Sequence, residues 1–250
     1  MFLIPRSWYT IKTIKYKGRG VFAARDIGEG TIIGDYLGIL IKPDANNEKK
    51  NGLYDISGGI KYDILANQKI EGVHLVNHSC ANNCDIYPYQ GHMLLFALRK
   101  IFKGEELSLS YWMYAPYDKE TTCDMHACYC ESEICTGSMH HAAVNFELWE
   151  KLVKKEFGDW YNKIPGKYGE PLLPLGSYPD SVQQENIKIY EYNLFGSEAK
   201  RAEKYKDKTL PTMPELRKRI RKTGKQLLFP KLKMTIYGIR DGMLLVKRMK

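Results

Sequence analysis

HLVNHSCANNC, residues 74–84, is the stretch around which we expect the fold of this chain to be organised. An apolar pair, Leu75 and Val76, leads into a cluster of amide, imidazole, hydroxyl and thiol groups. Buried groups of these kinds need hydrogen-bond partners, so a strand interior holds them only where the surrounding chain supplies those partners. The same residue types also form ordinary turns. Three further features of the sequence favour a functional site over a turn.

Length and composition set the first limits. The 250 residues, 44% of them hydrophobic, are enough to bury the core of one large or two modest domains. No apolar run approaches the roughly 20 residues of a membrane-spanning helix, so we expect no membrane partner. Residues 1–10 are too short and too polar for a signal peptide, and we expect an intracellular protein. The net charge of +9 favours acidic partners such as nucleic acid, although a basic surface is often only solvated.

Six cysteines lie in two groups, at positions 80, 84, 123, 128, 130 and 135. In a reducing compartment they are expected to bind a metal rather than to form disulfides. Cys128, Cys130 and Cys135 can surround one ion, but a structural zinc site needs four ligands. The spacing leaves the fourth ligand open between Cys80, Cys123, Cys84 and His126.

Gly18-Arg19-Gly20 and the residues after it superficially match a dinucleotide-binding fingerprint. That fingerprint requires a strand before the glycines and a helix that begins on them. Here residues 26–30 form a turn and residues 31–33 return to a β-rich pattern, so the Rossmann interpretation fails. What remains is a glycine pair that allows another group to approach the backbone closely.

Short strands between glycine turns are expected for most of the first 112 residues. Residues 31–41 predict two short strands with Tyr36 between them, and residues 53–64 predict two more around a turn at residues 57–59. Residues 93–98 form a continuous apolar run, which predicts a strand buried on both faces. Residues 108–112 alternate like a final strand.

The C-terminal part has a different pattern. Apolar side chains recur at three and four residues over 142–160, which predicts an amphipathic helix. Residues 165–179 are rich in Pro and Gly, which is typical of a linker or an irregular wrap. A further helix is expected around residues 183–190, and a closing hairpin over residues 234–246. The basic stretch at residues 217–222 is most simply a solvated helix face.

Five motifs, in order and at roughly the right spacing, resemble those of SET-domain protein lysine methyltransferases with a post-SET tail. They are Gly18-Arg19-Gly20, Asp35-Tyr36-Leu37-Gly38, Asn77-His78-Ser79-Cys80, Gly104-Glu105-Glu106-Leu107-Ser108 with Tyr111, and Cys128, Cys130, Cys135 and Gly137. The match runs from about residue 12 to about residue 140. Each motif alone is modestly specific, whereas five in register are highly specific.

The resemblance implies a mainly β (α+β) fold of small curled sheets, in which the segments around Asn77 and Tyr111 form a pseudoknot. The implied divisions are a SET catalytic domain over residues 1–117, a post-SET zinc-binding segment over 118–140, and a C-terminal region over 141–250. That last region is expected to be partly helical, to end in a β-hairpin, to pack on the catalytic unit and to shape the peptide groove.

The resemblance also assigns ligands to residues. S-adenosylmethionine would contact Lys17, Gly18, Arg19, Gly20, Asn77, His78 and Tyr111. A substrate lysine would enter from the opposite face, through a channel bordered by the two expected catalytic residues, Tyr36 and Tyr111. In the family, the cysteine of the Asn-His-Ser-Cys motif completes the structural zinc site, which implies one zinc ion held by Cys80, Cys128, Cys130 and Cys135.

The implied activity is in-line transfer of a methyl group to a lysine amine of a protein, commonly a histone tail. Burial beside the positive sulfur would lower the pKa of the substrate lysine, and a tyrosine hydroxyl would orient its amine. A nuclear or chromatin location follows, with nucleosomal DNA a candidate partner of the basic C-terminal region.

Four positions depart from the family's pattern: His74 replaces an arginine, Asn82 a proline, Leu109 an aromatic residue that helps set how many methyl groups are added, and Ser110 an aspartate. None of these removes a group that the transfer step needs. One alternative is a SET-like module without catalysis that binds chromatin or another protein. A second, a zinc-containing nucleic-acid binder, leaves Asn77, His78 and Tyr111 without a role and ranks lowest.

Overall fold

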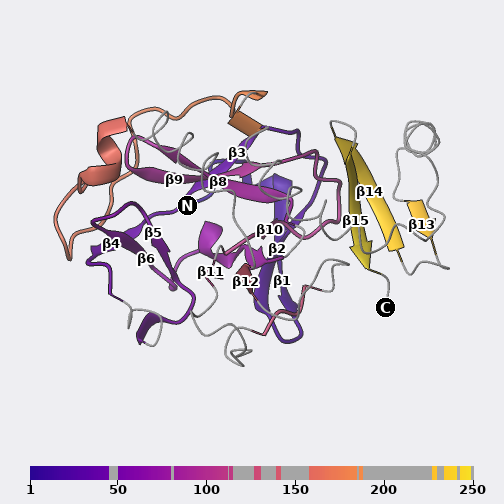
Figure 1. Ribbon diagram of the computed structural model, residues 1–250, viewed down its shortest axis with the longest axis horizontal. Helices are drawn as coiled ribbons and strands as arrows, with labels where there is room; N and C mark the ends of the chain where they lie inside the picture. Colours follow the sequence, from indigo (N-terminus) through magenta and orange to yellow (C-terminus); the bar gives the residue numbers. More distant parts are fainter. Residues whose placement is uncertain are drawn as a thin grey trace. The chain divides into compact units, whose positions relative to one another are not determined.

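The computed structural model describes residues 1–44, 50–79, 82–111, 113–114, 127–130, 139–141, 158–184, 186–187, 227–229, 234–240 and 243–248 (Figure 1). The chain divides into two compact units. Unit 1 consists of Met1–Asn77, Asn83–Leu109 and Phe146–Tyr190, and unit 2 of His78–Asn82, Ser110–Asn145 and Glu191–Lys250. Within the described ranges, no helix is long and apolar enough to cross a membrane.

A β-hairpin carries the first glycine motif in unit 1. The short 3₁₀ helix η1 (Arg6–Trp8) leads into β1 (Tyr9–Ile14), which pairs antiparallel with β2 (Gly18–Ala23). Gly18 enters β2 with a φ of 73°, a conformation that glycine adopts at no steric cost. The glycine motif therefore lies in a strand, and the rejection of the Rossmann interpretation is confirmed.

A five-stranded sheet forms the centre of the fold, in the order β3-β9-β8-β10-β7. The strands are β3 (Ile32–Asp35), β9 (His92–Ala97), β8 (Cys84–Tyr89), β10 (Ser108–Leu109) and β7 (Asn77–His78). All six residues of β9 are buried, which confirms the prediction from its apolar run. β9 pairs antiparallel with β3 and β8, and β10 pairs parallel with β8. The end of the Gly-Glu-Glu-Leu-Ser motif, in β10, therefore lies beside β8, the strand that follows the Asn-His motif.

A second, three-stranded sheet has the order β4-β6-β5, formed by β4 (Gly38–Ile41), β6 (Asp63–Ala66) and β5 (Asp55–Ser57). The predicted hairpin around residues 57–59 is present, since β5 and β6 pair antiparallel from Ser57 and Asp63. The two short strands predicted within residues 31–41 are also present, as β3 and β4. They belong to different sheets, because β3 pairs with β9 and β4 pairs with β6.

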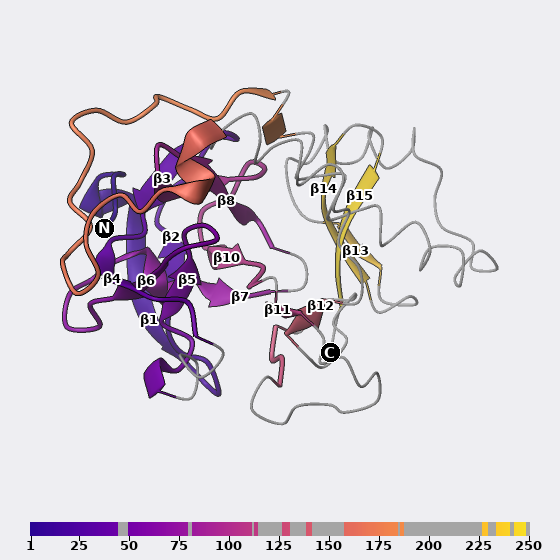
Figure 2. The ribbon, with the colours of Figure 1, turned by 60° about the vertical axis from the view of Figure 1, so that its left-hand side comes forward.

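Residues 158–187 wrap around unit 1 (orange in Figure 2). After η4 (Gly158–Asn162) the backbone is irregular, as the Pro and Gly content predicts. The Leu40 amide donates to the Glu170 carbonyl and the Leu172 amide donates to the Gly38 carbonyl, so the wrap covers the open edge of β4. Further along, the Val182 amide donates to the Gly30 carbonyl. Buried Leu172, Val182 and Ile187 join the core, and we call residues 165–187 the strap.

Unit 2 contains two small sheets among its described residues. β11 (Met113–Tyr114) pairs parallel with β12 (His140–His141). β13 (Leu227–Phe229), β14 (Met234–Arg240) and β15 (Met243–Arg248) form an antiparallel sheet, which contains the predicted closing hairpin. Most of the predicted helix over residues 142–160 and the basic stretch at 217–222 lie outside the described residues.

The mainly β class is thus confirmed, with short 3₁₀ segments such as η2 (Val73–Leu75) between small sheets. Gln184, Asn186 and Ile187 are helical, within the helix predicted around residues 183–190. The pseudoknot stays a prediction.

Candidate active site

Gly20 lies at the bottom of a narrow cradle in unit 1. A Cβ atom at this position would lie 2.4 Å from Ile14 Cδ1, 2.8 Å from Asn77 Nδ2 and 3.0 Å from Glu106 Oε1. A Cβ atom here would require the ends of the Ile14 and Asn77 side chains to shift, so glycine leaves the room in which Asn77 and Glu106 approach β2. At Gly18, by contrast, a Cβ would meet no atom of the described residues within 4 Å. The glycine motif is therefore closed at Gly20 and open at Gly18.

Asn77 joins the second motif to the first. Its side-chain Nδ2 donates to the Arg19 carbonyl at 3.1 Å and to Glu106 Oε1 at 3.0 Å. Both N–H groups of the carboxamide are used in this way. Of the predicted cofactor residues, Lys17 and Asn77 therefore bind the carboxylate of Glu106, Gly20 lies beside it, and Arg19 is joined to them through Asn77. Gly18 is the neighbouring residue on β2 with open space around it.

Glu106 also binds Lys17. Lys17 Nζ lies 2.5 Å from Glu106 Oε2, and the two side chains are only 15% and 21% exposed. A charge-assisted hydrogen bond with this little solvent around it is stronger than an exposed surface pair. One carboxylate thus connects the glycine motif, the Asn-His motif and the Gly-Glu-Glu-Leu motif.

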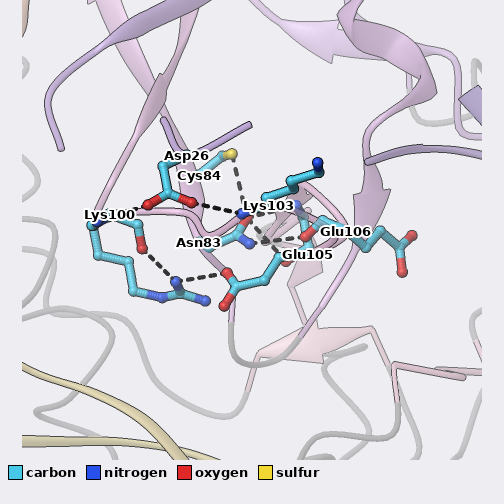
Figure 3. A network of polar contacts seen from close by, with 9 residues as sticks. Asp26, Asn83, Cys84, Lys100, Lys103, Glu105 and Glu106 are labelled. Carbon is cyan, nitrogen blue, oxygen red and sulfur yellow. Dashed lines mark hydrogen bonds and ion pairs between the residues drawn. The ribbon is translucent and has the colours of Figure 1, made fainter. Parts of the chain in front are cut away.

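The backbone of the Gly-Glu-Glu-Leu segment is held on both sides. Asn83 Nδ2 donates to the Glu106 carbonyl at 2.8 Å, and Asn83 Oδ1 accepts from the Ser108 amide at 2.8 Å (Figure 3). The Leu107 amide donates to the Val21 carbonyl on β2. Neighbouring Glu105 points to the other side in Figure 3 and forms an ion pair with Arg99 at 2.9 Å. The two consecutive glutamates therefore have separate partners.

His78 and Tyr111 lie together in unit 2. The Tyr111 amide donates to His78 Nδ1 at 3.2 Å, and the two rings meet edge to face with centroids 5.4 Å apart. Because Nδ1 accepts this hydrogen bond, the neutral imidazole carries its proton on Nε2. His78 is buried and Tyr111 half-buried. The departure Ser110, which precedes Tyr111, is buried as well.

Tyr36, the other expected catalytic residue, is a buried residue of unit 1. Its hydroxyl donates to the Tyr54 carbonyl at 2.9 Å, and its amide donates to the Met93 carbonyl at 3.0 Å. Tyr36 is therefore a fixed side chain whose hydroxyl donor is already used.

His74, where the family's pattern has arginine, is half-buried beside the ring of Tyr54. Burial lowers the pKa of His74 to about 4, with smaller contributions from the positive charges of the Met1 amino group and Arg19. The imidazole is neutral at pH 7, so His74 does not supply the positive charge that an arginine would carry at this position.

The predicted zinc ligands are only partly described. Cys128 and Cys130 are half-buried, whereas Cys80 and Cys135 lie outside the described residues. Among the described residues no group of three or more His, Cys, Asp or Glu side chains could hold a metal ion, so the zinc site stays a prediction. Cys84, one of the alternative ligands, is fully buried in β8, and burial raises the pKa of its thiol well above the ordinary value.

Two groups of side chains were not assigned a role from the sequence. Glu106 was recognised only as part of a motif, and no signal distinguishes it from Glu105. The buried carboxylate of Asp35 accepts hydrogen bonds at 2.8 Å from His92 Nδ1 and from the hydroxyl of Tyr178 in the strap. Position 178 is 143 residues away from Asp35, beyond the reach of any local pattern.

Comparisons with known proteins agree with the motifs. Residues 18–112 match the model of the SET domain. Over 131 residues the chain is 31% identical to histone-lysine N-methyltransferase trithorax of Drosophila virilis, and over 106 residues it is 34% identical to human histone-lysine N-methyltransferase 2B. These matches cover 47% and 38% of this chain but only 3% and 4% of the two relatives.

A solved structure titled "crystal structure of KRYPTONITE in complex with mCHG DNA and SAH" is 19% identical, with 54% of this chain and 29% of that chain covered. Its TM-score of 0.45 is too low to support a conclusion.

Proposed function

We propose that this chain, whose residues 18–112 match the model of the SET domain, is an S-adenosylmethionine-dependent protein lysine N-methyltransferase. The observation that carries the proposal is the cradle at Gly20, where Asn77 Nδ2 lies 3.1 Å from the Arg19 carbonyl of the glycine motif and 3.0 Å from Glu106 Oε1. A packing function alone does not require a charged pair and a carboxamide around a glycine with so little room.

The side chains of this cradle fit the amino-acid part of S-adenosylmethionine. Lys17 offers N–H donors for a carboxylate, and Asn77 offers its Oδ1 acceptor for an ammonium or amino group. The open space above Gly18 would let a ligand lie against the strand backbone. His78, next in sequence to Asn77, is a further proposed cofactor residue. When bound, the cofactor supplies a methyl group on a positively charged sulfur.

Tyr111 and Tyr36 are the proposed residues of the lysine channel. The acceptor lone pairs of their hydroxyl oxygens would orient a substrate amine and stabilise positive charge on it. A lysine that loses water in such a channel, near a cation, has a lowered pKa, so a neutral amine can form without a strong base. The contribution of the protein is to hold the two reactants in line.

A zinc ion bound by Cys80, Cys128, Cys130 and Cys135 is the proposed structural metal. Four thiolates suit zinc in a closed tetrahedral site. Elemental analysis of purified protein should find one zinc per chain, and substitution of Cys128 by serine should reduce that content.

A histone lysine is the proposed substrate, because the curated relatives are named histone-lysine N-methyltransferases. The net charge of +9 does not attract a basic histone tail by itself. Attraction of the basic C-terminal region to nucleosomal DNA would offset this repulsion, and we propose a nuclear location on these grounds. We expect the methylation rate at low salt to be higher on nucleosomes than on free histone tails. This difference should disappear as the salt concentration rises.

The direct test is a peptide-array assay with labelled S-adenosylmethionine, read for added methyl groups by mass spectrometry. Wild-type protein should methylate a lysine peptide, and Tyr111→Phe should lower the rate by on the order of 10²-fold, as expected for loss of a preorganised polar group. The alternative, a SET-like module without catalysis, predicts peptide or nucleosome binding with no mass increase in any substrate.

A further inference from the structure

We infer that Glu106 is a positioning residue of the cofactor site: its carboxylate orients the Asn77 carboxamide and compensates the charge of Lys17 beside a cationic methyl donor. The inference rests on the proposed function for the identity of the ligand. It goes beyond that function because it assigns a specific electrostatic task to one of two adjacent glutamates.

The first part of the argument is the orientation of Asn77. A carboxamide has a donor end and an acceptor end, and the partners decide which way it faces. Here the nearest partners are two acceptors, the Arg19 carbonyl at 3.1 Å and Glu106 Oε1 at 3.0 Å. A reversed carboxamide would place its oxygen against a carboxylate oxygen, which is repulsive. Glu106 therefore fixes Asn77 so that only its acceptor oxygen is presented to a ligand.

The second part is the position of Lys17. A lysine side chain has four flexible carbons and prefers water, so an ammonium that is only 15% exposed must be held there. Lys17 Nζ uses one of its three N–H donors for Glu106 Oε2, which lies 2.5 Å away. The other two can face a ligand carboxylate without any reorientation of the side chain.

The third part is charge. S-adenosylmethionine carries a sulfonium, an ammonium and a carboxylate, and so has a net charge of about +1 near neutral pH, whereas the demethylated product S-adenosylhomocysteine is close to neutral. An uncompensated Lys17 would repel the methyl donor more than the product. With Glu106 the pair is neutral, and the site does not disfavour the cationic form. Glu106 thus favours binding of the donor relative to the product.

The carboxylate is itself well supported. Glu106 forms an antiparallel bridge with Phe22 on β2, and Asn83 Nδ2 holds its carbonyl at 2.8 Å. The missing side chain at Gly20 leaves room for its Oε1. A group fixed by the backbone on both sides orients its neighbours at little entropic cost on ligand binding.

The experiment is calorimetric titration of the full chain with S-adenosylmethionine and, separately, S-adenosylhomocysteine. Glu106→Gln removes the charge at nearly constant volume. We expect its affinity to fall on the order of tenfold for S-adenosylmethionine and only about threefold for S-adenosylhomocysteine, since both ligands lose the positioning but only the first meets the unbalanced cation. A purely structural role would weaken both ligands equally.

Glu105→Gln is the matched control. It removes the same charge from the adjacent residue, whose Arg99 partner lies 2.9 Å away and whose side chain is 12% exposed. It should lower stability without changing the ratio of the two affinities. Glu106→Asp, which keeps the charge, should retain a ratio close to that of the wild type.

The double variant Lys17→Met/Glu106→Gln keeps the test valid if Glu106→Gln does not fold, because it removes both charges together. Its ratio of affinities should return toward the wild-type value. The inference would be overturned if Glu106→Gln lost affinity for both ligands equally. It would also be overturned if Glu106→Gln and the double variant had the same ratio of affinities for S-adenosylmethionine and S-adenosylhomocysteine. Failure of the wild-type chain to bind either ligand would instead refute the proposed function, so the two failures are distinguishable.

Discussion

The hydroxyl of Tyr178 should hold the strap on unit 1, and Tyr178→Phe tests this at a single atom. The hydroxyl donates to Asp35 Oδ2 at 2.8 Å and accepts from the Leu175 amide at 3.1 Å. Asp35 is completely buried, and its Oδ1 has no hydrogen-bond partner among the described residues. Burial and the nearby carboxylate raise the pKa of Tyr178, so the hydroxyl remains a donor throughout the neutral range.

The size of the effect follows from the two lost hydrogen bonds. A bond to a charged group contributes about 1.5–3 kcal/mol, and the bond from the Leu175 amide adds about 1 kcal/mol. His92 Nδ1, at 2.8 Å, would be the remaining described partner of the carboxylate. We therefore expect Tyr178→Phe to lower the free energy of unfolding by roughly 2–4 kcal/mol.

Hydrogen exchange measures this locally. The amides of Leu40, Leu172 and Val182 form backbone hydrogen bonds between the strap and the rest of unit 1. If the strap opens as one unit, their exchange should accelerate by roughly 30-fold or more, the factor that corresponds to 2 kcal/mol. The amide of Ala97, which lies in β9 and donates to the carbonyl of Thr31 next to β3, should remain protected.

Tyr168→Phe is the control in the same segment. The Tyr168 hydroxyl donates to the Lys61 carbonyl at 2.6 Å, but this residue is 39% exposed and its partner is uncharged. Its loss should change the free energy of unfolding by less than about 1 kcal/mol. Equal effects of the two substitutions, or unchanged exchange at Leu40 and Val182 in Tyr178→Phe, would refute the reasoning that the buried carboxylate anchors the strap.

Three further predictions concern the site. Gly20→Ala should displace Asn77 and weaken binding of S-adenosylhomocysteine on the order of tenfold, measured by titration, because the added Cβ would lie 2.8 Å from Nδ2. Burial lowers the pKa of His74 in the folded chain to about 4, below its unfolded value of about 6.5. The free energy of unfolding should therefore fall as the pH drops from 6.5 to 4. His74→Gln should remove that part of the pH dependence. Removal of zinc with a chelator should lower the melting temperature and methyl transfer together, and readdition of zinc should restore both; indifference to the chelator would contradict the proposed metal site.

Local patterns predicted the strands, because the apolar run or alternation that indicates a buried strand lies within a few consecutive residues. Residues 93–98 are apolar without interruption, and the strand His92–Ala97 is buried at every position. The turn at residues 57–59 likewise joins β5 and β6. Partners across the chain could not be predicted in the same way. The two strands predicted within residues 31–41 lie in different sheets, because β3 pairs with β9 and β4 with β6. The other edge of β4 is covered by Glu170 and Leu172, which lie in a segment with no strand pattern.

The same distinction applies to the site. Two consecutive glutamates on an extended segment must point to opposite sides, as their alternation requires. Which one faces Asn77 depends on the register between Glu106 and Phe22 across the β2 edge. That register is set by Leu107, whose buried side chain and amide bond to Val21 fix the segment. The motif therefore predicted which segment carries the glutamates, but only the pairing shows which carboxylate meets Asn77.

The position of Tyr36 connects the strap to the proposed lysine channel. Asp35, the residue before it, is held by Tyr178 of the strap and by His92, while Tyr36 itself is fixed at its amide by Met93 and at its hydroxyl by Tyr54. A side chain restrained at both ends cannot move to deliver a proton, and its donor is already used. What it can provide is a rigid wall, which suits an amine that must be held in line rather than chemically activated. Residues far beyond the SET match would then influence methyl transfer by keeping that wall in place.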